Sequence, residues 1–303
     1  MARLWCVGHL NMEDTFYPGR SPVFKAPGGA ALYAAAGARL WDAEVSVVSR
    51  IGDDYPDEYL DAMQAGGLRI DTIRTLEGPT MAGRTEYDSE GNRVYEMYTP
   101  PDRRLLLTPE PEDVDEERLR GTQAVHLATM PPRRQEGWLE RLRSLVPLIS
   151  MDTDVSFVRS DRSHLFGILE FVDIFLPSQV EAELFFPGMG LEAVADRLTR
   201  RGPKIVAIKL GQQGTYIRQR EREIGFHIPA IQAEVVDVTG AGDAFCGGFV
   251  AAYVESGEAI TAAWCGAASA SVAIEDYGAL HLLRSEKAEA ELRIQRFKGE
   301  YIA

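Results

Sequence analysis

The sequence has few of the residues that build disulfide frameworks or histidine metal sites. Only three of its 303 residues are cysteine, and Cys6, Cys246 and Cys265 form no CxxC pair and lie inside apolar runs. We therefore expect reduced, buried thiols rather than a disulfide or metal framework. The five histidines show no HExxH or other paired spacing, which argues against a histidine metal site.

The sequence also lacks an excess of basic residues and a long apolar segment. Its 32 Lys and Arg residues against 46 Asp and Glu residues give a net charge of −14, which repels nucleic-acid backbones and anionic lipid surfaces. No stretch reaches the roughly 18 apolar residues that span a bilayer, and the first residues do not form a secretory signal. We therefore expect a cytoplasmic protein that binds neither nucleic acid nor membrane.

What is present is a repeated alternation of short apolar, strand-like segments with amphipathic, helix-like stretches. This alternation predicts an α/β fold in which a doubly wound, mostly parallel sheet forms the middle of three layers. The strand-like segments are 3–7, 45–49, 124–127, 148–151, 174–176 and 204–210. The helix-like stretches are 30–41, 57–65, 135–145, 179–185 and 191–200.

One region, residues 72–99, interrupts the alternation because it contains strand-like segments and no helix. Segments 80–88 and 93–98 flank Ser89-Glu90-Gly91-Asn92, which is typical of a hairpin turn. With residues 12–26 they are expected to form a small β-sheet lid inserted in a single domain of residues 1–303. Such a lid excludes water from a site, and its open edge is a candidate homodimer contact; the alternative is a hairpin without a role.

The segment 237–243, Asp-Val-Thr-Gly-Ala-Gly-Asp, lies between a strand-like segment at 233–236 and a helix-like stretch. Gly240 and Gly242 allow backbone N–H groups to approach an anion closely, and the amino end of the helix favours negative charge. A strand, a glycine turn and a helix in this order predict an anion site. A carboxylate at Asp243 would be costly there unless it accepts a proton from an attacking hydroxyl group. The alternative is that Asp243 only caps the helix.

Residues 237–245 resemble the C-terminal signature of the PfkB carbohydrate kinases, which belong to the ribokinase-like superfamily. Pro27-Gly28-Gly29-Ala30, followed by an alanine-rich helix and by residues 48–54, is similar to the N-terminal signature of that family, and residues 8–13 are similar to the end of its first strand. The resemblance covers nearly the whole chain. It implies a ribokinase-like fold and ATP-dependent transfer of the γ-phosphoryl group to a hydroxyl of a sugar, polyol or related small alcohol. The alternatives are a nucleoside kinase of the same fold and a non-catalytic ligand-binding homologue.

The resemblance also implies roles for individual residues. Asp243 is expected to be the catalytic base, and the amides of the turn, at Gly240, Ala241 and Gly242, are expected to stabilise charge on the transferred group. The implied acceptor-binding residues are Asn11, Glu13, Gly28, Gly29 and Tyr33. The implied ATP-binding residues are Lys209, Gly211, Gly214, Ala268 and Ser271. Glu181 is expected to hold Mg²⁺ through water, and Asp237 is a candidate for a monovalent cation, potassium; read without the family, Glu181 would be a solvated residue in a first helical turn.

Several departures from the family pattern affect the acceptor side. Tyr33 stands where sugar kinases carry Asn, Glu13 stands where Asp is usual, and residues 152–156 replace an Asp-Pro-Asn-x-Arg pattern. Tyr33 either stacks on a ligand, which would suit a nucleoside, or packs as a core aromatic residue. The sequence therefore predicts phosphoryl transfer and leaves the acceptor open.

Overall fold

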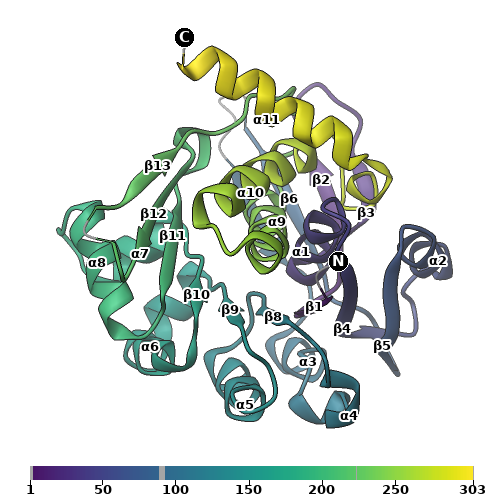
Figure 1. Cartoon of the computed structure of the whole chain (residues 1–303). Helices are drawn as coiled ribbons and strands as arrows, with labels where there is room; N and C mark the ends of the chain where they lie inside the picture. Colours follow the sequence, from purple (N-terminus) through teal and green to yellow (C-terminus); the bar gives the residue numbers. More distant parts are fainter. Residues whose placement is uncertain (1–2, 89–92, 223, 303) are drawn as a thin grey trace.

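A nine-stranded sheet forms the centre of the computed structural model, which describes residues 3–88, 93–222 and 224–302 (Figure 1). From one edge to the other its strands are β13 (Phe226–Ile228), β12 (Thr215–Gln219), β11 (Ile205–Lys209), β10 (Ile174–Phe175), β9 (Ile149–Met151), β8 (Ala124–Leu127), β1 (Arg3–Val7), β4 (Glu44–Gly52) and β5 (Leu68–Leu76). All neighbours from β11 to β5 are parallel, and β12 and β13 are added in antiparallel orientation. The chain reverses direction across the sheet at β1, which lies between β4 and β8. Ligand sites of doubly wound sheets form at such a switch point.

Helices cover both faces of this sheet. One face carries α1 (Ala30–Arg39), α9 (Ala241–Ser256) and α10 (Ala259–Ala273), and the other carries α5 (Pro132–Leu142), α6 (Val155–Ile168), α7 (Gln179–Phe185) and α8 (Leu191–Arg201). The remaining helical segments are α2 (Asp57–Ala65), α3 (Pro101–Leu106), α4 (Glu116–Leu119), α11 (Lys287–Ile302) and the 3₁₀ turns η1 (Pro111–Asp113), η2 (Leu169–Phe171), η3 (Gly211–Gln213) and η4 (Leu282–Arg284). Successive residues of β1 alternate between two cores, Cys6 in one and Val7 in the other, as the two-residue period of a strand requires.

Helices α1 and α9 pack with their backbones in close contact. A Cβ added to Gly247 would lie only 1.8 Å from the carbonyl oxygen of Ala34, so no residue larger than glycine fits there without a shift. This contact places the first turns of α9, which carry the predicted glycine turn, directly against α1. The two signature segments of the sequence are thereby brought together.

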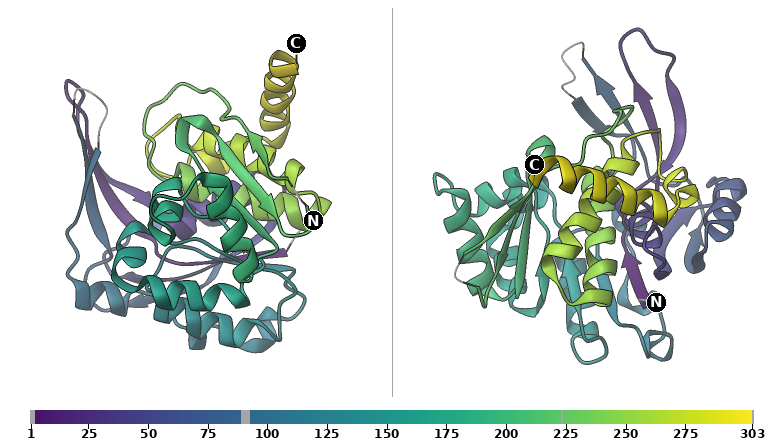
Figure 2. Two further views of the ribbon diagram at one scale, coloured as in Figure 1. Left: turned by 90° about the vertical axis from the view of Figure 1, so that its left-hand side faces the viewer. Right: turned by 45° about the horizontal axis from the view of Figure 1, so that its top comes forward.

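A second, four-stranded sheet extends from the body of the molecule, and we call it the lid sheet (Figure 2). Its order is β3 (Val23–Gly28), β2 (Asn11–Phe16), β6 (Ala82–Tyr87) and β7 (Arg93–Met97). The two hairpins are antiparallel, and β2 and β6 join them in parallel. The insertion expected at 72–99 begins later, because residues 72–76 pair with β4 in the large sheet. The predicted turn Ser89-Glu90-Gly91-Asn92 lies outside the described residues.

The predicted fold class is confirmed, and the predicted strands and helices of the main domain occur with ends that differ by at most three residues. The strand expected at 233–236 is wrong. The N–H of Val236 donates to the carbonyl of Ile274 rather than to a neighbouring strand, and Val235 is 51% exposed. Cys6, Cys246 and Cys265 are buried free thiols. In the described ranges, no helix combines the length and the apolar character that a membrane span needs.

Candidate active site

The glycine turn is fixed by the Tyr33 ring, which packs against it, and by hydrogen bonds within the segment 237–241. Gly240 is the N-cap of α9 with a left-handed φ of 76°, and a Cβ there would lie 2.3 Å from atoms of the Tyr33 ring. Oδ1 of Asp237 accepts the N–H of Thr239 at 3.0 Å, and the N–H of Ala241 donates to Val238 at 3.3 Å. The N–H groups that follow in the first turn of α9 have no acceptor within the helix, so the turn presents a positive end to an anion.

Asp243 is the third residue of α9 and is half-buried. The N-cap of this helix is Gly240, so Asp243 is not the N-cap residue that the alternative interpretation required. Its negative charge is among the causes that raise the pKa values of Lys209 and Cys246. The neighbouring residue Gly242 lies against the Lys209 side chain, so Asp243 belongs to a turn that packs on a buried cation.

Lys209, at the end of β11, supplies that cation. Its Nζ lies 2.5 Å from Oδ2 of Asp152 and 3.5 Å from Sγ of Cys246. Burial lowers the pKa of Lys209, but the charge of Asp152 and its neighbours outweighs this effect and the pKa is raised. A Cβ on Gly242 would lie 3.5 Å from Nζ, so the ammonium group lies directly behind the turn. Lys209 therefore stays charged, and its ammonium group forms an ion pair with Asp152 beside the glycine turn.

Glu181 lies in the first turn of α7 and is only 7% exposed, so its interpretation as a solvated residue is wrong. Its Oε2 accepts the N–H of Ser178 at 2.7 Å, and Oγ of Ser178 accepts the N–H of Glu181 at 3.4 Å, which is a capping box. Burial first, and then the charge of Asp152, raise the pKa of Glu181 to about 7, against the opposing effect of Lys209.

The carboxylate of Glu181 fits a Mg²⁺ ion that is held through water. The described residues contain no group of three metal-ligating side chains that could form a cage. Mg²⁺ usually keeps several waters and uses one or two carboxylates together with phosphate oxygens. Glu181 offers a hard oxygen donor close to the turn that would hold the phosphate. The role of Glu181 stays a prediction.

The other residues expected to bind ATP lie in two places. Gly211 begins the exposed η3 turn after β11, and Gly214 ends it against the backbone of Ile228. Ala268 and Ser271 are buried inside α10, where Oγ of Ser271 donates to the carbonyl of Ala268. Neither α10 side chain offers an exposed surface to a nucleotide, so the cofactor role of both rests on the resemblance.

The residues expected to bind the acceptor gather where β2 meets β3. Asn11 and Glu13 are 6% and 7% exposed, and Nδ2 of Asn11 donates to Oε1 of Glu13 at 2.9 Å. Oδ1 of Asn11 is buried and has no hydrogen-bond partner in the part of the chain that the structure describes. A Cβ on Gly28 would lie 2.9 Å from this oxygen, and Gly29 is the N-cap of α1. The lid sheet therefore presents one unsatisfied acceptor oxygen beside a buried carboxylate.

Tyr33 lies between the two groups of residues and is 2% exposed. Burial raises its pKa, and the charges of Glu13, Asp237 and Asp243 add to the effect. Its ring supports Gly240. The structure thus favours a core aromatic residue beneath the turn over a ring that stacks on a ligand.

The sequence analysis missed an aromatic contact between the lid sheet and the glycine turn. The hydroxyl of Tyr87 donates to Oδ1 of Asp237 at 2.8 Å. The Tyr17 ring is stacked on the Tyr87 ring at 4.0 Å with an interplanar angle of 8°, and the Tyr277 ring meets Tyr17 edge-on at 6.3 Å. These residues come from three distant segments, and no local pattern in the sequence marks them.

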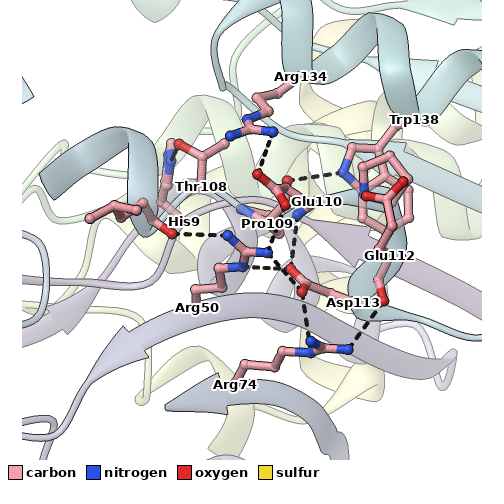
Figure 3. A network of polar contacts seen from close by, with 12 residues as sticks. His9, Arg50, Arg74, Thr108, Pro109, Glu110, Glu112, Asp113, Arg134 and Trp138 are labelled. Carbon is pink, nitrogen blue, oxygen red and sulfur yellow. Dashed lines mark hydrogen bonds and ion pairs between the residues drawn. The ribbon is translucent and has the colours of Figure 1, made fainter. Parts of the chain in front are cut away.

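A network of charged side chains lies where the segment after α3 meets β4 and β5 (Figure 3). The Arg50 guanidinium donates to both carboxylate oxygens of Asp113, at 2.7 and 2.9 Å, and Arg74 lies 3.2 Å from the same carboxylate. The Asp113 side chain is fully buried, and Arg50 also contacts Glu110 at 3.2 Å. Nη1 of Arg50 donates to the carbonyl of Leu106. The segment after α3 is thereby tied to β4 and β5.

The segment that leads into β6 is hydrogen-bonded to residues of the N-terminal signature. The N–H of Gly52 donates to Oγ1 of Thr80 at 2.9 Å, and Oδ1 of Asp54 accepts the N–H of Thr80 at 2.7 Å. The segment after β7 is fixed as well, because Nε of Arg103 donates to the carbonyl of Pro79. Both connections of the β6–β7 hairpin are therefore held firmly by the body.

Comparison with known proteins identifies a family of kinases. Residues 1–285 match the model of the pfkB family of carbohydrate kinases. A cytidine kinase of Thermococcus kodakarensis is 28% identical over 256 residues, which are 84% of this chain and 89% of that protein. A nucleoside kinase of Methanothermobacter thermautotrophicus is 29% identical over 91% of this chain and 90% of that protein. The Escherichia coli protein described as ribokinase II, in complex with ATP and Mg²⁺, has the same fold with a TM-score of 0.82, at 23% identity and with 98% and 100% of the two chains covered.

The fold and the glycine turn define a phosphotransferase of the ribokinase type. The chain belongs to the pfkB family of carbohydrate kinases. It is an ATP-dependent kinase that transfers a phosphoryl group to a hydroxyl group of a small molecule. The family, the fold and the class of reaction expected from the sequence are thereby confirmed.

Proposed function

We propose that the acceptor is a nucleoside whose ribose hydroxyls are bound by Asn11 and Glu13. The observation that carries this proposal is the buried, unpartnered Oδ1 of Asn11 beside the buried carboxylate of Glu13. Two neighbouring hydrogen-bond acceptors suit the two hydroxyl donors of a vicinal diol, and a buried acceptor without a donor is costly. The contact between Asn11 and Glu13 fixes the amide so that Oδ1 remains for the ligand.

Two further observations support a nucleoside over a free sugar. Two of the three similar proteins named above are a cytidine kinase and a nucleoside kinase, and each of these is matched over most of its length. The loop that carries the half-buried Tyr277 lies beside the diglycine, since the N–H of Ala279 donates to the carbonyl of Pro27, and the Tyr277 ring meets the Tyr17 ring edge-on. Aromatic faces at the edge of a sugar site suit contact with a base.

The proposed chemistry follows from the positions of the charges. The acceptor hydroxyl oxygen bonds to the γ-phosphorus of ATP while the bond from that phosphorus to the bridging oxygen of ADP breaks. The hydroxyl proton passes to the carboxylate of Asp243, and ADP leaves with the bridging electron pair. The N–H groups of the turn and the ammonium of Lys209 stabilise the negative charge on the transferred group.

We propose Mg²⁺ as the metal that accompanies ATP, held through water by Glu181. When bound, it would neutralise charge on the phosphate oxygens. Potassium near Asp237 is a separate proposal. Oδ1 of Asp237 already accepts two hydrogen bonds, so such a cation would use Oδ2 and main-chain carbonyls. Activity in potassium compared with activity in choline at equal ionic strength tests that site.

We also propose that the lid sheet is an insertion in a single kinase domain and that it closes over the acceptor. A separate proposal is that its outer strands form a homodimer contact. Its outer strands β3 and β7 expose the large apolar side chains of Phe24 (62%) and Val94 (70%). Exposed apolar residues on a sheet edge favour pairing with a second copy. Sedimentation of the wild type and of Val94→Lys tests the contact, and a wild-type monomer at all concentrations would refute it.

The acceptor is tested by turnover of a panel of ribonucleosides, 2′-deoxynucleosides, ribose, fructose and inositols with ATP and Mg²⁺. We expect ribonucleosides to be phosphorylated with the highest kcat/KM. Loss of the 2′-hydroxyl should lower kcat/KM by about 10-fold, which corresponds to one or two hydrogen bonds. Turnover of free sugars with no turnover of any nucleoside would refute the proposal.

A further inference from the structure

Tyr87 connects the lid sheet to the glycine turn through a hydrogen bond to Asp237. It is the last residue of β6, it is 5% exposed, and its hydroxyl donates to Oδ1 of Asp237 at 2.8 Å. The partners are 150 residues apart in the sequence. The Tyr17 ring, which follows β2, stacks on Tyr87 and fixes the plane of its ring. Both hairpins of the lid sheet therefore contribute to the position of this one hydroxyl.

Asp237 uses the same oxygen to shape the turn. Its Oδ1 accepts the N–H of Thr239 at 3.0 Å, and its carboxylate is 2% exposed. Its own N–H donates to the carbonyl of Ile274 at 3.2 Å, so the main chain of Asp237 is fixed to the end of α10. The Tyr87 hydroxyl and the N–H of Thr239 together fix where Oδ1 lies, so the Tyr87 hydroxyl helps to hold Thr239 in place.

The orientation of Thr239 matters because the next residue begins the anion site. Gly240 has a left-handed φ and rests on the Tyr33 ring, and Asp243 lies one turn further on. A displacement of the turn would move the N–H groups and the Asp243 carboxylate together. Misplacement of reacting groups by about 1 Å costs on the order of 10²-fold in rate.

We propose that Tyr87 is a positioning residue for phosphoryl transfer. Its hydroxyl, carried by the lid sheet, fixes Asp237 and through it the glycine turn when the lid sheet lies against the body. The N–H groups of the turn are therefore positioned for phosphoryl transfer only when Tyr87 is bonded to Asp237. The proposal rests on the transfer reaction of the family and is independent of whether the acceptor is a nucleoside.

The test compares Tyr87→Phe with the control Tyr98→Phe. The first variant keeps the ring that stacks on Tyr17 and removes only the donor to Asp237. The second removes a hydroxyl from a 48% exposed tyrosine at the end of the lid sheet. With any acceptor that the wild type phosphorylates, we expect Tyr87→Phe to lower kcat about 10-fold while the KM for ATP changes less than twofold. Tyr98→Phe should leave both unchanged.

Amide hydrogen exchange of the peptide 237–245 provides a readout that needs no acceptor. We expect faster exchange in unliganded Tyr87→Phe than in the wild type and in Tyr98→Phe. This result does not depend on the acceptor. Failure of the nucleoside proposal can therefore be told apart from failure of the positioning role of Tyr87. Unchanged exchange and a kcat within twofold of the wild type would refute the positioning role.

A double-mutant cycle with Asp237→Asn separates positioning from a general structural effect. If Tyr87 acts through Asp237, the double variant should have the kcat of Asp237→Asn alone, because the partner is already altered. Additive losses in kcat would show that Tyr87 acts by another route and would overturn the proposal. A change in the acceptor KM alone would assign Tyr87 to acceptor binding instead.

Discussion

The two halves of the proposed active site differ in construction. The proposed transfer half consists of the turn 237–243 at the start of α9, Glu181 in the first turn of α7, and Asp152 and Lys209 at the ends of β9 and β11. The acceptor half consists of Asn11, Glu13 and the diglycine 28–29, and it lies on the lid sheet and at its junction with α1. The first half is built from charges fixed in the body of the molecule. The second is built from hydrogen-bonding groups on a sheet that projects from the body. In the proposed site, the residues of phosphoryl transfer and those that bind the acceptor therefore belong to separate structural units.

The base of the lid sheet belongs with the rigid part of the molecule. Asp113 has a fully buried side chain between two arginines, and Thr80 is bonded to residues of the N-terminal signature. Away from the base, the lid sheet contacts the body through the Tyr87–Asp237 hydrogen bond, the edge-on contact of Tyr17 with Tyr277, and the hydrogen bond from the Tyr59 hydroxyl to the carbonyl of Lys25. We therefore expect motion of the lid sheet to pivot at its base and to be governed by the contact at Asp237.

The largest effect should come from the transfer half. Asp243→Asn removes the proton acceptor and keeps the shape of the side chain. We expect kcat to fall by about 10² to 10⁴ while the dissociation constant for ATP changes little, because the N–H groups of the turn remain. Pre-steady-state kinetics with ATP binding measured separately checks both quantities. If the Asn variant had a normal kcat, Asp243 would not be the base. The turn 237–243 would then lose its assigned role in phosphoryl transfer.

A second effect, on stability, should come from the base of the lid sheet. Asp113→Asn leaves Arg50, whose side chain is 13% exposed, without its main counter-charge. Breaking a buried ion pair from one side costs about 3–5 kcal/mol, and the remaining contact with Glu110 lowers the expected loss to about 2–3 kcal/mol. Denaturant unfolding measures this loss, with Asp115→Asn, an exposed aspartate two residues away, as the control. Equal stability of both variants would show that the network does not anchor the lid sheet.

How far the sequence predicts each half depends on whether its contacts are local. The glycine turn was predicted because all its parts lie within seven consecutive residues and their spacing carries the chemistry. The Lys209–Asp152 pair was not predicted, since the two residues are 57 apart and meet only because β9 and β11 both flank β10. The Tyr87–Asp237 bond has no local signal for the same reason. The strand expected at 233–236 failed because β-branched residues can occupy an extended segment that pairs with no strand.

A third and smaller effect should come from the acceptor half. Asn11→Ala removes the unpartnered acceptor oxygen and one hydrogen bond to Glu13. We expect kcat/KM for the acceptor to fall by about 10-fold, the size of one hydrogen bond, with the KM for ATP unchanged. The same substitution should have less effect on an acceptor that lacks the hydroxyl bound by Oδ1. An equal loss for both acceptors would show that Asn11 only supports Glu13.

The smallest effect concerns the pH dependence of stability, and it should again come from the transfer half. In the folded protein burial, followed by the charge of Asp152, raises the pKa of Glu181 to about 7, above its ordinary value of 4.5. The folded state therefore keeps a proton that the unfolded state has already released. The resulting stabilisation is fully present below pH 4.5 and is lost as the pH rises through 7. Without Mg²⁺ and in the presence of a chelator, we expect the wild type to lose about 1 kcal/mol more than Glu181→Gln between pH 6 and 7. Glu183→Gln, which changes an exposed glutamate on the same helix, should behave as the wild type. Identical pH dependence in all three proteins would mean that Glu181 is ionised over the whole pH range and that burial does not raise its pKa.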